Sequence, residues 1–446
     1  MKISPVRILM FVENLFPDDA RVRNECHTLS AAGCSITVIC LRRKGQPFAE
    51  LVNGVQVYRL ARLSLFKKTP RANTNLFQRC CLKIASFVGY LGEYLYFTTA
   101  CLFMSLYVAF KHGFDVIHAH NPPDTLFLVA ALYKPFGKKF IFDHHDLSPE
   151  LYQSRYGANN NLITQVLRLM EKCSLKLANV TIATNESYKQ IQIQRGGVKP
   201  EKAFVVRNGP DFRRMTIHSP SKRLRQMDKC ILCYIGTMNP QDGVDYLLRS
   251  LRHLAFELGR KDFYCVIIGS GDSLADLRAL TIELRLGYFV EFTGYISDEA
   301  LFSNLAAADI CVDPDPSSPL NDVSTWIKIM EYMAYAKPIV SYDLKETRFS
   351  AQDAAIYVKP NDEGEFAEAI ASLMDQPMLR KTAGESGRKR VERDLQWPVV
   401  RKELLRAYET LLNTNGHIAE QIVRVPKRLG ARSKPGKLTC QADVID

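Results

Sequence analysis

Short apolar runs alternate with amphipathic stretches along the first half of the chain. Residues 6–12 (VRILMFV) form a continuous apolar run, which is typical of a strand buried on both faces of a parallel sheet. The apolar residues that follow keep a helical spacing through Leu29, Gly33 ends that helix, and a second strand is predicted at 36–41. Further strands of the same kind are predicted at 114–118, 139–143, 179–183 and 204–206. The first half therefore consists of repeated β-loop-α-β units.

The same alternation starts again at Cys230. Strands are predicted at 231–235, 263–268, 289–293 and 309–312, and helices at 242–258, 272–286, 361–374, 378–393 and 398–413. This pattern predicts an α/β fold with two doubly wound, Rossmann-like domains that face a cleft. We place the domains at residues 1–210 and 211–400, a helix that returns to the first domain at 401–415, and a basic, flexible tail at 416–446.

Composition narrows the class of partner. The net charge is +12, and it comes from the first half, where residues 1–215 hold 29 Lys and Arg against 15 Asp and Glu. No nucleic-acid motif accompanies this charge, so we expect no nucleic acid and favour an anionic membrane surface. The twelve cysteines show no disulfide framework, which indicates reduced thiols in the cytoplasm.

A basic segment followed by an apolar one supports that expectation. The apolar stretch at 84–110 is long enough to span a bilayer, but Glu93 and two glycines weaken a spanning helix. Three interpretations stay open: a true span, a helix at the membrane interface with the basic segment on headgroups, and an ordinary buried helix pair. The basic residues that precede it are Arg62, Lys67, Lys68, Arg71, Arg79 and Lys83.

Polar side chains gather where the strands of the first domain end, which is the edge at which open α/β sheets bind ligands. Arg21 and Arg23 follow the first strand and are candidate acceptor-side residues, with a solvated helix start as the alternative. Neighbouring histidines at spacings of one and two point in different directions, so we expect no metal site. The other acceptor-side candidates are His118, His120, Asp124 and His144.

Most of the candidate donor-binding side chains lie in residues 309–343. A predicted helix begins near Ser324, with Asp322, Ser324 and Thr325 as capping residues. Ser324, Lys328 and Glu331 form a polar stripe on this otherwise apolar helix, which either satisfies itself through a Lys328–Glu331 pair or faces a ligand. A helix N-terminus and a lysine suit a phosphate, and a glutamate suits sugar hydroxyls.

Taken in order, these motifs resemble the retaining nucleotide-sugar glycosyltransferases of family four, which have the GT-B fold. The resemblance covers roughly residues 6–413 and rests on FPDDARVRNE, FDVIHAHNPPD, DHHDLSPE, NGPD, IGTMNPQDGVDYLL and NDVSTWIKIMEYMAYAKPIV. It implies a donor held by the second domain and an acceptor held by the first. It also implies transfer without a metal or other cofactor, the nucleotide-sugar being a co-substrate.

The resemblance also assigns roles to individual residues of this chain. Glu331 matches the second glutamate of the family's Glu-x7-Glu motif, which implies a contact with the donor ribose, and His145 matches the histidine near the transferred sugar, with His144 as the alternative. The first glutamate falls at Val323, so the resemblance leaves Asp322 as its substitute. The resemblance implies a diphosphate near Gly236. The arginine and lysine that neutralise the diphosphate in the family fall at Thr237 and Asp242 of this chain. We therefore expect Lys328 and the N–H groups near Thr325 and Gly243 to replace them.

The leading hypothesis is therefore a hexosyltransferase that moves a sugar from a nucleotide donor to a glycan or lipid-linked acceptor, in the biosynthesis of cell-surface or extracellular polysaccharide. We expect it in the cytoplasm, peripheral on the inner membrane face. Two other hypotheses stay open, which are a nucleotide-sugar 2-epimerase on the same fold and a degenerate, non-catalytic scaffold.

Overall fold

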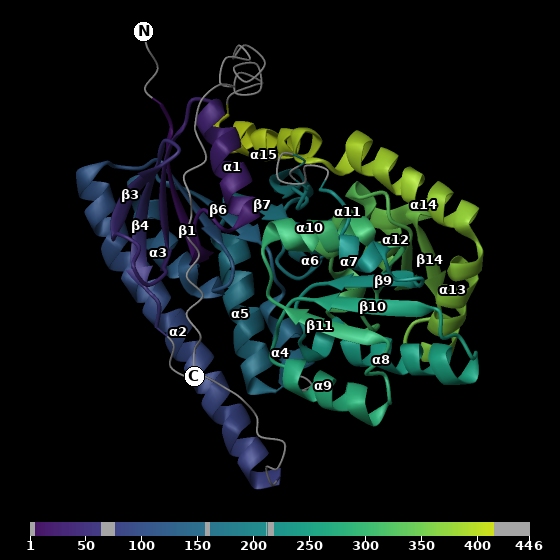
Figure 1. Cartoon of the computed structure of the whole chain (residues 1–446). Coiled ribbons are helices and arrows are strands. Elements are labelled where there is room, and N and C mark those ends of the chain that lie inside the picture. Colours follow the sequence, from purple (N-terminus) through teal and green to yellow (C-terminus); the bar gives the residue numbers. More distant parts are fainter. Residues whose placement is uncertain (1–4, 64–75, 157–160, 211, 213–217, 414–446) are drawn as a thin grey trace.

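The computed structural model describes residues 5–63, 76–156, 161–210, 212 and 218–413. The predicted tail at 416–446 and much of the predicted basic segment lie outside the described residues. Two α/β domains stand side by side, each a twisted sheet with helices on both faces (Figure 1).

The first sheet has eight strands in the order β3-β4-β2-β1-β5-β6-β7-β8. The pairs are parallel except for β3 with β4, an antiparallel hairpin on one edge that the apolar pattern did not predict. The strands are β1 (Arg7–Leu15), β2 (Ser35–Arg42), β3 (Ala49–Val52), β4 (Val55–Ala61), β5 (Val116–His120), β6 (Lys139–His144), β7 (Val180–Ala183) and β8 (Ala203–Val205).

Helices cover both faces of this sheet, and one of them is unusually long. Helix α2 is a single helix of 36 residues on the outer side of the domain, so one of the three interpretations of 84–110, a buried helix pair, is wrong (Figure 1). The α-helices are α1 (Ala20–Ala31), α2 (Leu76–Lys111), α3 (Phe127–Tyr133), α4 (Ser148–Tyr156), α5 (Leu162–Leu177) and α6 (Glu186–Gln194).

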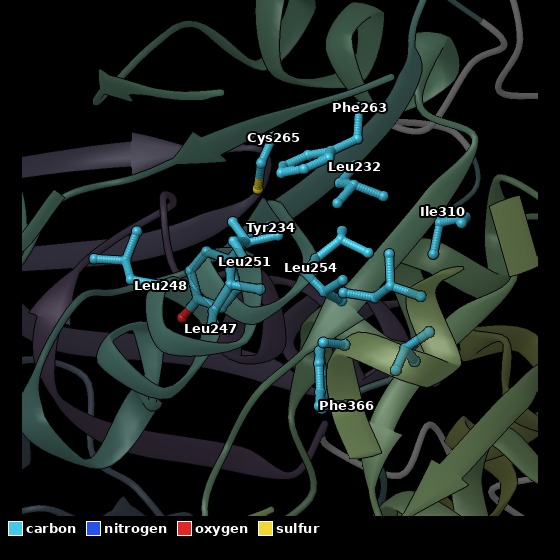
Figure 2. Close-up of a cluster of buried hydrophobic side chains, with 14 of the residues drawn as sticks. Leu232, Tyr234, Leu247, Leu248, Leu251, Leu254, Phe263, Cys265, Ile310 and Phe366 are labelled. Carbon is cyan, nitrogen blue, oxygen red and sulfur yellow. The ribbon is translucent and has the colours of Figure 1, made fainter. Parts of the chain in front are cut away.

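The second sheet has six strands, and its neighbours all pair in parallel in the order β11-β10-β9-β12-β13-β14. Side chains of β9, β10, α8 and α13 form one of its two cores, in which Leu232, Phe263 and Phe366 are fully buried (Figure 2). The strands are β9 (Cys230–Ile235), β10 (Phe263–Ile268), β11 (Val290–Gly294), β12 (Ile310–Asp313), β13 (Ile339–Tyr342) and β14 (Ala355–Val358).

The helices of the second domain follow the predicted alternation, with a short additional one before the sheet and two that were not predicted, α10 and α12. They are α7 (Lys222–Arg225), α8 (Val244–Arg252), α9 (Leu274–Glu283), α10 (Asp298–Ala307), α11 (Ile327–Ala334), α12 (Lys345–Ala351), α13 (Glu363–Asp375) and α14 (Pro377–Arg390).

The last helix, α15 (Trp397–Leu412), crosses back to the first domain, as predicted. Leu404 and Tyr408 are fully buried in the core beneath β1 and β7, and Trp397 Nε1 donates a hydrogen bond of 2.9 Å to Thr28 Oγ1 of α1. The predicted class, two doubly wound domains joined again by a C-terminal helix, is confirmed.

Candidate functional site

A cavity of about 700 Å³ opens between the two domains. The carboxyl ends of β1 and β6 and helix α4 form its first wall, and the loop after β9 and the start of α11 form the second. The residues that bear on chemistry are Asp18, Asp19, Arg21, His145 and Arg155 on the first wall, and Gly236, Thr237, Asp242, Ser324, Thr325, Lys328 and Glu331 on the second.

Arg21 anchors the first wall. Asp19 caps α1 by accepting from the N–H of Val22 at 3.1 Å, which places Arg21 on the first turn of the helix. Its guanidinium donates to Asp143 Oδ1 at 2.8 Å, to Asp143 Oδ2 at 3.0 Å and to the carbonyl of Val206 at 2.6 Å. Arg21 therefore ties α1 to the ends of two strands, and it lines the cavity while its charge is paired.

His145 is the histidine that faces the cavity. Its Nε2 lies 2.9 Å from Asp143 Oδ2, and its side chain stays 18% exposed. His144 points the other way, because neighbouring residues of a strand alternate between its faces. It is buried, with Nε2 3.2 Å from Glu171 Oε1, so the structure separates two histidines that the sequence left as alternatives.

His118 and His120 do not follow their strand as predicted, since β5 extends to His120, and both rings are buried and do not line the cavity. His118 Nδ1 hydrogen bonds to the Tyr408 hydroxyl at 2.9 Å, and His120 Nδ1 to His145 Nε2 at 3.2 Å. Burial and the neighbouring His118 lower the pKa of His120 to about 3, so its ring is neutral.

The spacing argument against a metal did not foresee this arrangement. One ligand atom from each of Glu25, His118, His120 and Asp143 lies within 4.8 Å of the others, and all four side chains are buried. The carboxylate of Asp143 is already engaged by Arg21 and His145, however, which leaves this group as a buried hydrogen-bonding and charge network around one arginine.

The remaining acceptor-side candidates lie away from the cavity. Arg23 donates to the carbonyl of Pro17 at 2.8 Å, and Asp124 is buried, where it accepts from Asn121 Nδ2 at 2.9 Å. Asp322 is also outside the cavity lining. It lies in a 3-10 turn, Asn321–Val323, where its Oδ2 accepts from Ser317 at 3.2 Å. The structure does not bring these three residues to the site.

The start of α11 differs from the prediction. The helix begins at Ile327, and its N-cap, Trp326, makes no side-chain cap. Ser324 Oγ donates to the carbonyl of Leu320 at 2.7 Å instead, and Thr325 accepts from Asn185 Nδ2 of the first domain at 3.0 Å. Both residues line the cavity, but their hydroxyls bridge segments rather than cap a helix.

Lys328 lines the cavity as predicted, yet its ammonium is already paired. Nζ lies 3.0 Å from Asp313 and 2.7 Å from Asp315, on the segment that ends β12, and all three side chains are buried. Burial alone lowers the pKa of Lys328, but the charge of Asp315 raises it well above its usual range. The self-contained Lys328–Glu331 pair is therefore wrong as an account of this lysine.

Asp242 occupies the place where the resemblance expected a cation. Its carboxylate accepts from the N–H of Asn239 at 2.8 Å and from Thr237 Oγ1 at 3.0 Å, and burial raises its pKa. Helix α4 of the first domain lies against this turn, and the charge of Arg155 acts on Asp242 across the cavity. Sequence reasoning missed Arg155, because no local pattern indicates a contact with the other domain.

Comparison with known proteins fits this architecture. Residues 20–214 match a family model described as Glycosyltransferase Family 4, and residues 229–376 match one described as Glycosyl transferases group 1. An alpha-D-kanosaminyltransferase of Streptomyces kanamyceticus is 30% identical over 163 residues, 36% of this chain and 40% of that protein. An uncharacterized glycosyltransferase of Methanocaldococcus jannaschii is 23% identical over 337 residues, 72% of this chain and 83% of that protein.

A third relative is a GDP-mannose-dependent monoacylated alpha-(1-6)-phosphatidylinositol monomannoside mannosyltransferase of Corynebacterium glutamicum. It is 25% identical over 209 residues, 44% of this chain and 53% of that protein.

Solved structures share the fold over almost the whole chain. Sucrose-phosphate synthase from Thermosynechococcus elongatus superposes with a TM-score of 0.70 at 20% identity, covering 92% of this chain and all of that one (100%). The Anabaena protein HepE in complex with UDP-glucose gives 0.65 at 16% identity, covering 91% and 99%. From the two family-model matches and this architecture together, the chain is a glycosyltransferase with the GT-B fold.

Proposed function

We propose that this glycosyltransferase moves a hexose or related sugar from a nucleotide-sugar donor to a glycan or lipid-linked acceptor, with retention of configuration and without a metal. The observation that carries the proposal is one cavity that is lined by both His145 of the first domain and Glu331 of the second. HepE binds UDP-glucose, and the mannosyltransferase relative acts on a phosphatidylinositol monomannoside, which supports a nucleotide-sugar and a lipid-linked acceptor here.

In this proposal Glu331 holds the ribose, and Gly236, Thr237, Ser324 and Thr325 surround the diphosphate. Asp242 lies on the same wall, and the charge of Lys328 is already paired with the buried Asp313, so Lys328 alone does not balance an incoming diphosphate. Burying a diphosphate without a cation would cost several kcal/mol of binding free energy. Arg155 reaches the same turn from the opposite domain, and we propose that it supplies the missing charge when the cavity is occupied.

The reaction then needs little acid–base chemistry. The acceptor hydroxyl attacks from the face that the diphosphate leaves, and the leaving oxygen takes up the acceptor proton. Arg155, Lys328 and N–H groups of the cavity stabilise the negative charge that grows on the diphosphate. His145 contacts the transferred sugar from the first wall. The product class is cell-surface or extracellular polysaccharide.

The first test is donor binding. We expect one of UDP, GDP, ADP or CMP, or a sugar conjugate of it, to raise the melting temperature of the protein, because saturating ligand at a hundredfold excess over Kd stabilises by about 2.7 kcal/mol. Glu331→Ala and Arg155→Gln should each weaken that binding at least tenfold, whereas Lys172→Gln, an exposed cation on α5, should leave it unchanged.

The opposite result is equally informative. If no nucleotide shifts a folded protein, the crowded carboxyl groups around Lys328 favour the non-catalytic scaffold instead. If Arg155→Gln binds donor as the wild type does, the diphosphate is held by the second domain alone.

The exposed face of α2 supports a membrane location. Between Leu91 and Lys111 this helix is long and apolar enough to cross a membrane by length and composition, and only 28% of its apolar window is buried. Its exposed large apolar residues lie at spacings of three, four and eight positions, with one adjacent pair, and form one apolar stripe along the helix. The stripe consists of Leu91, Leu95, Phe103, Leu106, Tyr107 and Phe110.

We propose that this stripe enters the interface of an anionic inner membrane leaflet and holds the protein at its lipid-linked acceptor. The protein should sediment with vesicles of anionic phospholipid and less with neutral ones. Phe103→Gln combined with Phe110→Gln should release it, and Ile282→Gln, an equally exposed apolar residue of the second domain, should not. A wild type that stays in the supernatant at low salt contradicts the membrane location.

A further inference from the structure

The side chain of His145 is held from within the first domain. Nε2 is 2.9 Å from Asp143 Oδ2 and 3.2 Å from His120 Nδ1, so one ring edge faces a buried carboxylate. The backbone is held as well, because Asn121 Oδ1 accepts from the N–H of His145 at 2.6 Å and of Asp146 at 3.2 Å. The end of β5 thus contacts both the ring and the main chain of His145, and Asp143 of β6 contacts the ring.

Asp143 is itself buried and charged. Its side chain is fully buried, and Arg21 donates to both of its oxygens. Burial would raise the pKa of Asp143, but the Arg21 charge holds it well below its usual range. His145 therefore meets an ionised carboxylate whose position is set by α1.

We infer that Asp143 is a positioning residue for His145, which it holds in the tautomer with the proton on Nε2. A lone pair facing the Asp143 Oδ2 oxygen would be repulsive, and His145 Nε2 lies nearer that oxygen, at 2.9 Å, than His120 Nδ1 does, at 3.3 Å. We therefore assign the proton to His145 Nε2, and His120 Nδ1 keeps its lone pair and accepts from it at 3.2 Å. This inference rests on the proposed function in so far as His145 contacts the transferred sugar. It adds a residue that the resemblance does not supply. Arg21 in turn positions Asp143 by donating to both of its oxygens.

The consequence for transfer follows from the tautomer. With the proton on Nε2, Nδ1 keeps its lone pair and accepts a hydrogen bond from a sugar hydroxyl. The negative charge of Asp143 lies directly behind the ring, and it stabilises the positive charge that develops on a sugar losing its diphosphate. Asp143 should therefore affect turnover more than donor affinity.

A double-mutant cycle tests this role. Asp143→Asn should lower kcat at least tenfold and leave the donor Kd within twofold, since its amide can turn an N–H toward Nε2 and select the wrong tautomer. His145→Ala should lower kcat to a similar extent. In the His145→Ala background, Asp143→Asn should cause no further loss beyond twofold. A further tenfold loss there overturns the inference.

A second measurement needs no catalysis and does not depend on whether Asp143→Asn folds. In wild-type protein labelled with ¹⁵N-histidine, the His145 ring, identified by its absence from the spectrum of His145→Gln, should show protonated Nε2 and unprotonated Nδ1. Protonation on Nδ1 alone overturns the inference even if Asp143→Asn fails to fold. If His145→Ala keeps full kcat, the sugar contact in the proposed function fails, but the spectrum still decides whether Asp143 sets the tautomer.

Discussion

Individual buried charges show how closely this site depends on pairs made across the fold. Lys328 is enclosed with Asp313 and Asp315, both from a segment that lies before it in the chain. Loss of one partner of such a group leaves an uncompensated charge in a region of low polarity. Lys328 is therefore needed for the stability of the folded protein, whether or not it also binds a ligand.

We accordingly predict that Lys328→Ala lowers the free energy of unfolding by about 3–5 kcal/mol. The measurement is urea denaturation without nucleotide. Lys345→Ala, an exposed lysine of the same domain, should change it by less than about 0.5 kcal/mol. Adding Asp313→Asn and Asp315→Asn to Lys328→Ala should recover part of the loss, and no recovery would show that the charge imbalance is not its cause.

Asp124 gives a prediction about pH. Burial raises its pKa to about 6, so between about pH 4 and 6 the folded state binds more protons at this group than the unfolded state. Protonated Asp124 therefore stabilises the folded state below about pH 4. As the pH rises through about 6 this stabilisation is lost, and the free energy of unfolding falls by up to about 3 kcal/mol.

Asp124→Asn should remove this dependence. Relative to the wild type, the variant should gain stability between pH 4 and 6, and the difference should stay constant above about pH 7. Chemical denaturation at several pH values measures it. A difference that does not vary with pH would mean that folding does not raise the pKa of Asp124.

At the scale of elements, the turn that leads into α8 admits only glycine. Gly243 has a φ of +65°, and a Cβ on it would lie 2.0 Å from the carbonyl oxygen of Pro314 in the neighbouring loop. The close contact joins the turn of Asp242 to the loop of Asp315, two parts of the second wall of the cavity.

Gly243→Ala should therefore destabilise the second domain by about 1–3 kcal/mol and weaken donor binding, because the turn must move away from the loop. Thermal denaturation with and without nucleotide measures both effects. Gly45→Ala has a similar φ of +86° but an open surrounding, so it controls for backbone strain alone. Equal losses in the two variants would rule out the contact with Pro314 as the cause.

At the scale of the molecule, two connections make the domains dependent on each other. Helix α15 completes the first core, and the cleft side is bridged by Asn185 Nδ2 to the carbonyl of Val323 at 2.8 Å and by the N–H of Ser187 to Glu346 at 3.1 Å. Helix α15 follows α14 after a short π-helical turn, Val391–Leu395 (Figure 1).

We predict a single calorimetric unfolding transition for the whole chain. Leu404→Ala removes a fully buried side chain of α15 and should shift that transition as a unit, with a loss of about 2–5 kcal/mol. Lys402→Ala, exposed on the same helix, should not shift it. Two separate transitions, with only one moved by Leu404→Ala, would show that the domains unfold independently.

The sequence by itself determined the two sheets, their order along the chain and the returning helix. Strands such as 263–268 and helices such as 398–413 are encoded by local periodicity, which burial on both faces makes strong. It did not predict the β3–β4 hairpin, whose first strand is exposed at an edge and carries no apolar alternation. It also placed Glu331, Lys328 and His145 at the cleft, because a strand end or helix start fixes where a side chain can go.

Only the tertiary structure decided which groups meet. Asp143 lies 122 residues from Arg21, Tyr408 lies 290 from His118, and Arg155 reaches Asp242 from another domain. Such pairs depend on register and on the packing of whole elements, for which the local spacing carries no signal. That is why Asp322 and His118 were expected in the cleft and lie outside it, and why the partners of Lys328 and His145 emerge only when the chain is folded.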